Sequence, residues 1–133
     1  MKVEGRCHCG QITFEADVDP ETVRICHCTD CQSLSGSAYR VNVQAPAKSF
    51  VLLSGEPKVY IKTAESGNKR AHAFCSNCGT PIYAAAPRDT PSYGLRVGTL
   101  MQRGELRPAR QIWFRSAQTW VCDLRDVPRT PQQ

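Results

Sequence analysis

Seven of the eight cysteines in this 133-residue chain fall into three short groups, and their spacing restricts the fold more than any other feature. The groups read Cys7-x-Cys9-Gly10, Cys26-x-Cys28-x-x-Cys31 and Cys75-x-x-Cys78-Gly79. The first residues lead into the first group without an apolar leader, so we expect reduced thiols in a cytoplasmic protein. Closely spaced thiols of this kind typically hold metal and do not form disulfides.

Two of the groups are suited to share one ion. In Cys-x-x-Cys-Gly a tight turn directs two thiolates at one metal, and Gly79 suits a backbone position that needs a positive φ. In Cys-x-Cys an extended backbone places both side chains on one face. Together they predict a closed structural zinc site with four ligands: Cys7, Cys9, Cys75 and Cys78. Structural zinc contributes about 10–16 kcal/mol in peptides, against a net stability of roughly 5–15 kcal/mol for a domain, so we expect this clamp to decide whether the domain folds.

The third group supplies three thiols within six residues: Cys26, Cys28 and Cys31. A catalytic zinc site has three protein ligands and one exchangeable position, so these cysteines are predicted to be the ligands of a catalytic zinc. Counting thiols therefore predicts two Zn²⁺ ions per chain.

The alternative is that both ions are structural and that a histidine completes the second tetrahedron. The candidates are His8, His27 and His72. His8 and His27 lie between cysteines, where the backbone turns their side chains away, and His72 is expected to be structural. Cys122 lies outside the groups and is expected to be a small buried apolar residue.

Alternation of apolar and polar residues predicts a mainly β fold. Residues 11–18 place every second residue on an apolar face, as in a half-buried strand. No stretch sustains a helical stripe, and only one short helical turn is expected after Cys28, with Thr29 or Asp30 as its N-cap. We therefore expect a small zinc-stabilised domain with curved sheets over residues 1–127 and a flexible tail over 128–133. Further strands are predicted at residues 22–26, 38–43, 50–53, 59–62, 71–74, 82–86, 93–100 and 111–115.

Composition excludes some classes of protein. No apolar run approaches the roughly 18–20 residues of a membrane-spanning helix, so we expect no membrane partner. The chain has 17 Lys and Arg against 12 Asp and Glu, a net charge of +5. These basic residues are scattered, without the run of about 5–8 that marks a nucleic-acid patch, so nucleic acid is not the expected partner.

The three cysteine groups together resemble the glutathione-dependent formaldehyde-activating enzyme family, also called the CENP-V/GFA domain. Supporting matches are Phe74 before the third group, residues 35–38 after the second, Ser66-Gly67 and a late Trp120. The resemblance covers roughly residues 3–127. It implies a β-rich Mss4-like (β-tent) zinc fold and the same division of the seven cysteines into a structural and a catalytic zinc. Gln111 stands where the family often has a histidine.

The resemblance implies a carbon–sulfur lyase activity in which glutathione adds to formaldehyde to give S-(hydroxymethyl)glutathione. Three thiolates on Zn²⁺ leave a formal charge of −1, which weakens activation of water but suits an incoming thiol. Arg40, Lys69 and Arg70 are candidates to bind the substrate's carboxylates, and Asp30 or Glu65 could act as acid–base. The alternative is a non-catalytic zinc module that contacts nucleic acid or protein through its basic surface.

Overall fold

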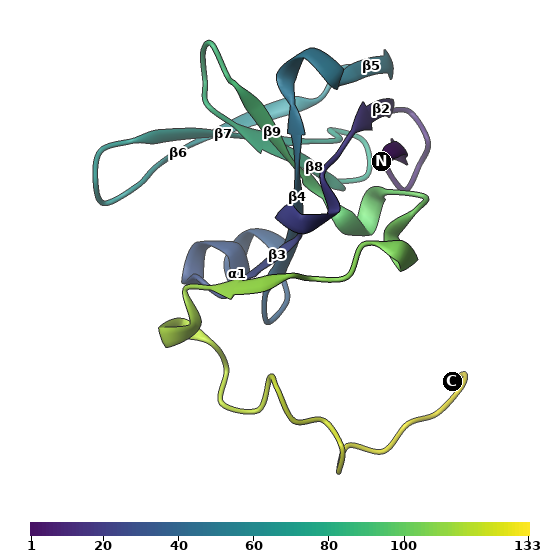
Figure 1. The fold of residues 1–133 in the computed structure, drawn as a ribbon, viewed down its shortest axis with the longest axis vertical. Helices are drawn as coiled ribbons and strands as arrows, with labels where there is room; N and C mark the ends of the chain where they lie inside the picture. Colours follow the sequence, from purple (N-terminus) through teal and green to yellow (C-terminus); the bar gives the residue numbers. More distant parts are fainter.

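The computed structural model describes residues 1–133 and contains ten strands, one short α-helix and five 3-10 turns (Figure 1). The helix α1 spans Thr29–Ser35. The 3-10 turns are Pro20–Thr22, Ala47–Ser49, Val97–Thr99, Arg103–Glu105 and Phe114–Ser116. The strands are β1 (Lys2–Arg6), β2 (Thr13–Asp17), β3 (Arg24–Cys26), β4 (Arg40–Pro46), β5 (Val51–Ser54), β6 (Lys58–Thr63), β7 (Lys69–Phe74), β8 (Pro81–Ala85), β9 (Ser92–Arg96) and β10 (Arg110–Ile112).

The mainly β prediction is confirmed, with two differences at the level of elements. Each predicted strand overlaps an observed one, but β1 was not predicted, and residues 97–99 and 114–115 lie in 3-10 turns where strands were expected. The helical turn after Cys28 is present as α1. Its N-cap is Cys28 itself, whose Sγ accepts a hydrogen bond from the Cys31 N–H, so the expected cap at Thr29 or Asp30 was wrong.

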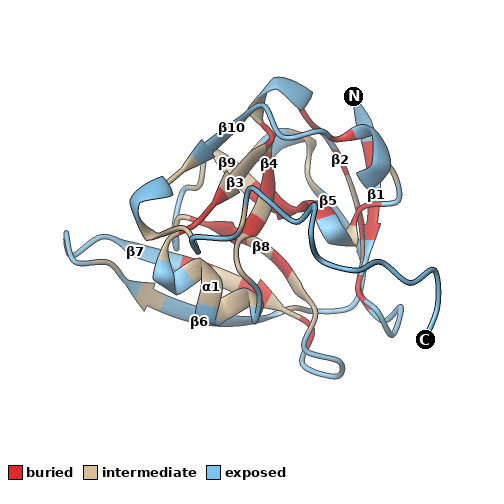
Figure 2. Ribbon diagram, turned by 90° about the horizontal axis from the view of Figure 1, so that it is seen from below, coloured by how far each residue is buried: buried red, intermediate tan, exposed pale blue.

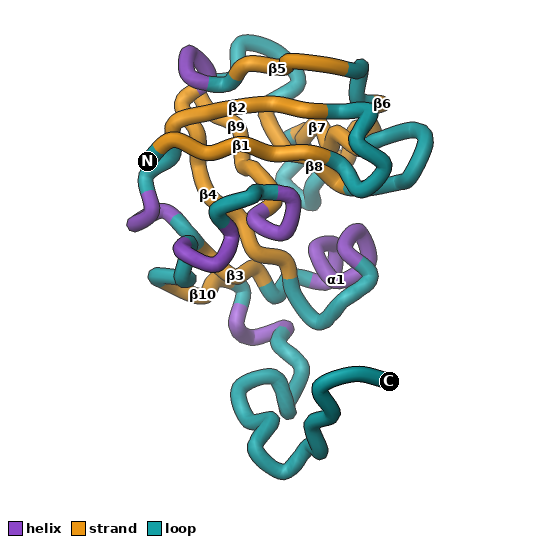
Figure 3. The backbone as a smooth tube through the Cα atoms, turned by 90° about the vertical axis from the view of Figure 1, so that its right-hand side faces the viewer, coloured by secondary structure: helices purple, strands orange, loops and turns teal.

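The strands form two sheets. Three strands lie in the order β1-β2-β5, and seven lie in the order β10-β3-β4-β9-β8-β7-β6. All pairs are antiparallel except β10 with β3, where Ile112 lies opposite Cys26 in a parallel register. Figure 3 shows β1, β2 and β5 side by side as one layer, with α1 at some distance from it.

The hydrophobic core lies between the two sheets. Val3 and Phe14 of the three-stranded sheet and Val43 and Leu95 of the seven-stranded sheet belong to one cluster of buried residues. Figure 2 shows buried segments on strands of both sheets. Phe50 packs on this core, with its ring centroid 5.5 Å from that of Phe14. Period-two alternation of a strand thus determines which face of β4 and β9 is apolar.

On β4 and β9 the opposite face of the seven-stranded sheet is polar although its residues are also buried. Arg40 and Asn42 alternate with the core-facing residues of β4, and Arg96 of β9 lies opposite Asn42. Cross-strand partners share a face, so Cys26, which lies opposite Arg40, belongs to this polar side. The fold therefore separates an apolar face from a face that carries thiol and guanidinium groups.

The chain beyond Ser116 forms no further strand or helix and extends away from the sheets (Figure 1). Cys122 in this segment is exposed, so the expectation that it is buried was wrong. The segment after Ser116 adds no strand to either sheet, so Cys122 does not reach the hydrophobic core between the sheets. The division into a domain of residues 1–127 and a tail stays a prediction. No helix in the structure has both the length and the apolar character needed to span a bilayer.

Candidate metal centres

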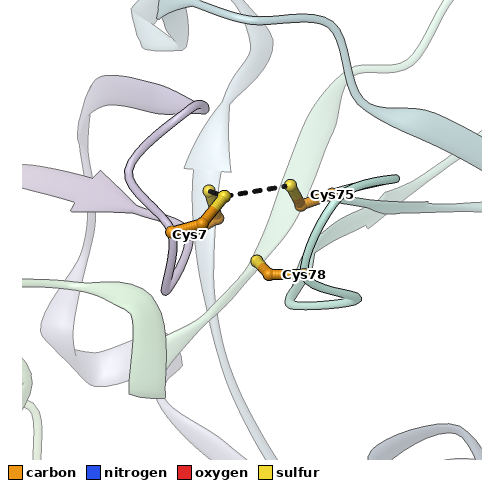
Figure 4. A group of neighbouring side chains, drawn as sticks. Cys7, Cys75 and Cys78 are labelled. Carbon is orange, nitrogen blue, oxygen red and sulfur yellow. Dashed lines mark hydrogen bonds between the residues drawn. The ribbon is translucent and has the colours of Figure 1, made fainter.

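The first and third cysteine groups meet at one point although almost seventy residues separate them. Cys7 and Cys9 follow β1, and Cys75 and Cys78 form the turn between β7 and β8 (Figure 4). The four Sγ atoms lie within 4.8 Å of one another. Two of the separations are 3.5 Å, between Cys7 and Cys9, and 3.7 Å, between Cys9 and Cys75.

The backbone around this group is arranged to favour anionic sulfur. Gly10 and Gly79 have φ of 82° and 78°, as expected for the tight turn after each pair. The Ile12 N–H donates to Cys7 Sγ at 3.3 Å. A hydrogen bond from the Thr80 hydroxyl is the main cause that lowers the pKa of Cys78 to about 5.

This geometry fits a tetrahedral zinc ion. Zn–S bonds of about 2.3 Å imply S···S separations of about 3.8 Å in a tetrahedron. The Cys7–Cys9 and Cys9–Cys75 separations are close to that value without any rearrangement. Four thiols, with backbone and hydroxyl donors directed at the sulfurs, are a donor set that suits Zn²⁺.

The second cysteine group forms a separate cluster around the start of α1. Cys26 ends β3, Cys28 caps the helix and Cys31 lies in its first turn. Their three Sγ atoms also lie within 4.8 Å of one another. A hydrogen bond from Cys31 is the main cause that lowers the pKa of Cys26 to about 5, while the same bond raises the pKa of Cys31. The shared hydrogen bond thus favours the thiolate form of Cys26 over that of Cys31.

No histidine joins the three-thiol cluster. His27 is fully buried, and its Nε2–H donates to Gln111 Oε1 at 2.6 Å. His72 Nδ1 accepts from Arg96 Nη2 at 3.1 Å. His8 is exposed on the turn between the first two cysteines. The cluster of metal-binding side chains consists of three thiols alone.

A cleft of about 440 Å³ opens beside this cluster and includes Cys28 in its lining. Lys62 also lines it and forms a 2.5 Å salt bridge with Asp30, which raises the pKa of the lysine. On the other side, Arg115 stacks 4.9 Å from the ring centre of Trp113. A small molecule in this cleft would have access to a thiol of the cluster, to positive charge and to an aromatic face.

Lys62, Trp113 and Arg115, which line the cleft, were not among the candidates from the sequence, and neither was Arg96. Of the three basic candidates, only Arg40 is buried on the polar face, whereas Lys69 and Arg70 are exposed. Arg96 was missed because its position depends on the pairing of β9 with β4, which no local pattern specifies. Asp30 is engaged by Lys62, and Glu65 lines the cleft.

The two sheets and two cysteine clusters define a mainly β, Mss4-like protein with sites suited to zinc. The chain belongs to the glutathione-dependent formaldehyde-activating enzyme (GFA) family, whose sequence model matches residues 2–116. The family assignment made from the cysteine groups is thus confirmed.

Two individual proteins resemble the chain. A Halomonas elongata protein, provisionally named a glutathione-dependent formaldehyde-activating enzyme, is 27% identical over 92 residues, which cover 66% of this chain. The chain spans 59% of the length of that relative. A crystal structure of a Rhodobacter sphaeroides protein has the same fold, with a TM-score of 0.63 and 21% identity over 84% of this chain and 99% of the other.

Proposed function

We propose that the protein is a zinc-dependent carbon–sulfur lyase that forms and cleaves the adduct of formaldehyde with a small thiol such as glutathione. The single observation that carries the proposal is the cluster of Cys26, Cys28 and Cys31, which has three thiols and opens on a cleft. Family membership and the name of the Halomonas relative support this choice of reaction.

The two clusters have different roles in this proposal. Cys7, Cys9, Cys75 and Cys78 hold a structural zinc, and Cys26, Cys28 and Cys31 are the ligands of a catalytic zinc. Zinc held by three thiolates lowers the pKa of a fourth, incoming thiol and keeps it nucleophilic at neutral pH. A reducing compartment such as the cytoplasm would keep all seven thiols available.

The chemistry is a reversible addition. In the forward direction the thiol loses its proton, the sulfur forms a bond to the carbonyl carbon of formaldehyde, the C=O π electrons move to oxygen, and that oxygen takes up one proton. In the reverse direction the hydroxyl loses the proton as the carbon–sulfur bond breaks, and the released thiolate takes up a proton. Glu65 lines the cleft beside Cys28 and is a candidate to exchange this proton. The Trp113–Arg115 pair would shield one side of the bound thiol from water.

The test is turnover of glutathione plus formaldehyde by the zinc-loaded full chain, measured in both directions and corrected for the uncatalysed addition. Cys28→Ser is expected to reduce the rate to that of the uncatalysed reaction. Cys122→Ser is the matched control because it removes an exposed thiol outside both clusters. Equal rates for the wild type and Cys28→Ser would overturn the proposal.

The same preparations also test the alternative of a non-catalytic module that binds nucleic acid. Affinity for a nucleic acid through phosphate contacts falls steeply with salt. Binding with that salt dependence, together with no turnover above background, would replace the enzyme by the binding module.

A further inference from the structure

Two buried arginines converge on the polar face of the seven-stranded sheet without any acidic partner. Arg40 is 5% exposed and Arg96 is 8% exposed, and neither takes part in a salt bridge. Arg96 donates to Asn42 Oδ1 and to His72 Nδ1, but its Nε is buried with no hydrogen-bond partner. Arg40 Nη1 lies 3.4 Å from His72 Nδ1, which is a long distance for a hydrogen bond.

Burying two arginine charges without an anion destabilises the folded protein. Removing an unpaired charge from water costs several kcal/mol, and two like charges side by side add to that cost. His72 cannot act as their counter-charge because it can only be neutral or positive. Burial, with Arg96 and Arg40 next in importance, lowers the pKa of His72 to about 4, so its Nδ1 serves as a neutral acceptor. The compensating negative charge must therefore come from outside these three residues, from the nearby thiols of Cys26 and Cys31 or from a bound anion.

The arginines line a cavity that could admit such an anion. Its volume is about 350 Å³, and Leu34, Tyr60 and Phe74 contribute apolar wall. Apolar walls reduce the screening by water and so strengthen the attraction between a guanidinium and an anion. The fixed fork of a guanidinium matches the two oxygens of a carboxylate.

The cavity is adjacent to the three-thiol cluster. Arg40 lies directly opposite Cys26 across the β3–β4 pair. Leu34 follows Cys31 by three residues on α1, and residues at that spacing lie on one face of a helix. If the cluster holds Zn²⁺ with three thiolates, its formal charge of −1 offsets one of the two guanidinium charges. At least one positive charge remains, because Arg70 also acts on His72 and Arg96, and a bound carboxylate would compensate it.

We propose that Arg40 and Arg96 form a carboxylate-binding site, and that the thiol substrate of the three-cysteine centre carries the carboxylate that this site binds. The first part stands on the buried arginines and their cavity. The second part rests on the proposed function. A phosphate could use the same donors, and the titration therefore compares the two anions.

The first part is tested by NMR on the metal-loaded full chain, following the arginine Nε–Hε signals during titration. Propionate is expected to shift the signals of Arg40 and Arg96 to saturation, whereas propionamide, its uncharged isostere, is expected to leave them in place. Arg96→Gln should weaken propionate binding roughly tenfold or more, and Arg96→Lys, which keeps the charge but not the fork, should weaken it less. Arg107→Gln, a substitution of an exposed arginine, should bind as the wild type does.

Three results would overturn the carboxylate site. The first is that propionate and propionamide shift the arginine signals equally. The second is that Arg40→Gln and Arg96→Gln variants, with spectra that show the native fold, bind propionate with the affinity of the wild type. The third is that phosphate saturates the site at a lower concentration than propionate does. None of these readouts depends on turnover.

The second part is tested by turnover of two thiols with formaldehyde, 3-mercaptopropionate and 3-mercaptopropionamide. A lower KM for the acid, lost in Arg96→Gln, is expected. Equal KM values alongside specific propionate binding would overturn the link to the substrate and leave the anion site standing. Turnover of neither thiol nor glutathione would overturn the proposed function, whereas the NMR titration would still decide the anion site.

Discussion

His27 Nε2 donates a 2.6 Å hydrogen bond to Gln111 Oε1, which joins the centre of the three-cysteine segment to the last strand of the sheet. The imidazole is fully buried and packs edge-on against Tyr39 and Phe114, with ring centroids 5.5 and 5.3 Å away. The His27 N–H also donates to Ile112 O at 3.1 Å. Strand β10 thus holds the segment that carries the three thiols.

Gln111→Ala is expected to lower the free energy of unfolding by about 1–3 kcal/mol, because His27 Nε2 would remain buried without an acceptor. His27 Nδ1 has no partner already, so the ring would have none. Chemical denaturation of the metal-loaded protein measures this. Arg110→Ala, at an exposed neighbouring position of the same strand, is the control, and an equal effect of both substitutions would contradict the role given to the His27–Gln111 bond.

Substitutions in the two cysteine clusters are expected to differ in kind. Cys75→Ser should remove the metal that joins the β7–β8 turn to the end of β1, and with it the cooperative thermal unfolding transition, since metal binding of about 10–16 kcal/mol exceeds the stability of most domains. Cys28→Ser should retain a cooperative transition and reduce the metal content from two ions to one per chain. Metal analysis and circular dichroism on the same samples check both outcomes. A folded, one-metal Cys75→Ser protein would contradict the assignment of the clamp.

His72 should make the stability depend on pH. Its pKa is lowered in the folded state to about 4 by burial and by the neighbouring arginines, from about 6.5 when unfolded. Below pH 6.5 the unfolded chain therefore binds a proton that the folded chain does not, and stability falls as the pH falls from 6.5 toward 4.

The comparison that isolates this effect is His72→Gln, which keeps an acceptor for Arg96 but does not titrate. Because His72 is only partly buried, solvent screening reduces the effect, and we expect the wild type to lose about 0.5 kcal/mol relative to the variant between pH 6.5 and 5.5. Denaturant unfolding at both pH values measures it. A constant difference between the two proteins would contradict the assignment.

Gly5 lies directly opposite Phe14 in the β1–β2 pair, and the Phe14 ring occupies the space that a Cβ at residue 5 would need. Gly5→Ala is therefore expected to destabilise the protein by about 1–3 kcal/mol through overpacking. In a double-mutant cycle, Phe14→Leu should absorb part of this cost, so that the combined loss is smaller than the sum of the single losses. Strict additivity, measured by thermal or chemical unfolding, would show that the two residues do not interact as described.

The parts of this molecule that were predicted from the sequence are those encoded by neighbouring residues. Alternation marks β2 and β4, and the Cys-x-x-Cys-Gly spacing marks the turn that ends in Gly79. Strand β1 was missed because Gly5 breaks its apolar alternation, and that glycine is explained only by Phe14 on the neighbouring strand.

The cavity lined by Arg40 and Arg96 depends even more than β1 on pairing between strands that are distant in sequence. Arg40, His72 and Arg96 come from three strands that are distant in sequence, and their convergence follows from the order of strands in the larger sheet. An isolated arginine in a strand gives no sign of whether it will be buried. Two buried arginines with no acidic partner become visible only once the sheet is assembled.

The parallel register of β10 beside β3 also sets an order on biosynthesis. The thiols of Cys7, Cys9, Cys75 and Cys78 are all available once residue 78 has been synthesised, whereas the support for Cys26 and His27 waits for residue 112. In a nascent chain, the four sulfurs of the clamp can therefore meet before β10 has been added beside the three-thiol cluster. Of the two clusters, the three-thiol cluster is thus the later one to gain its full support during synthesis.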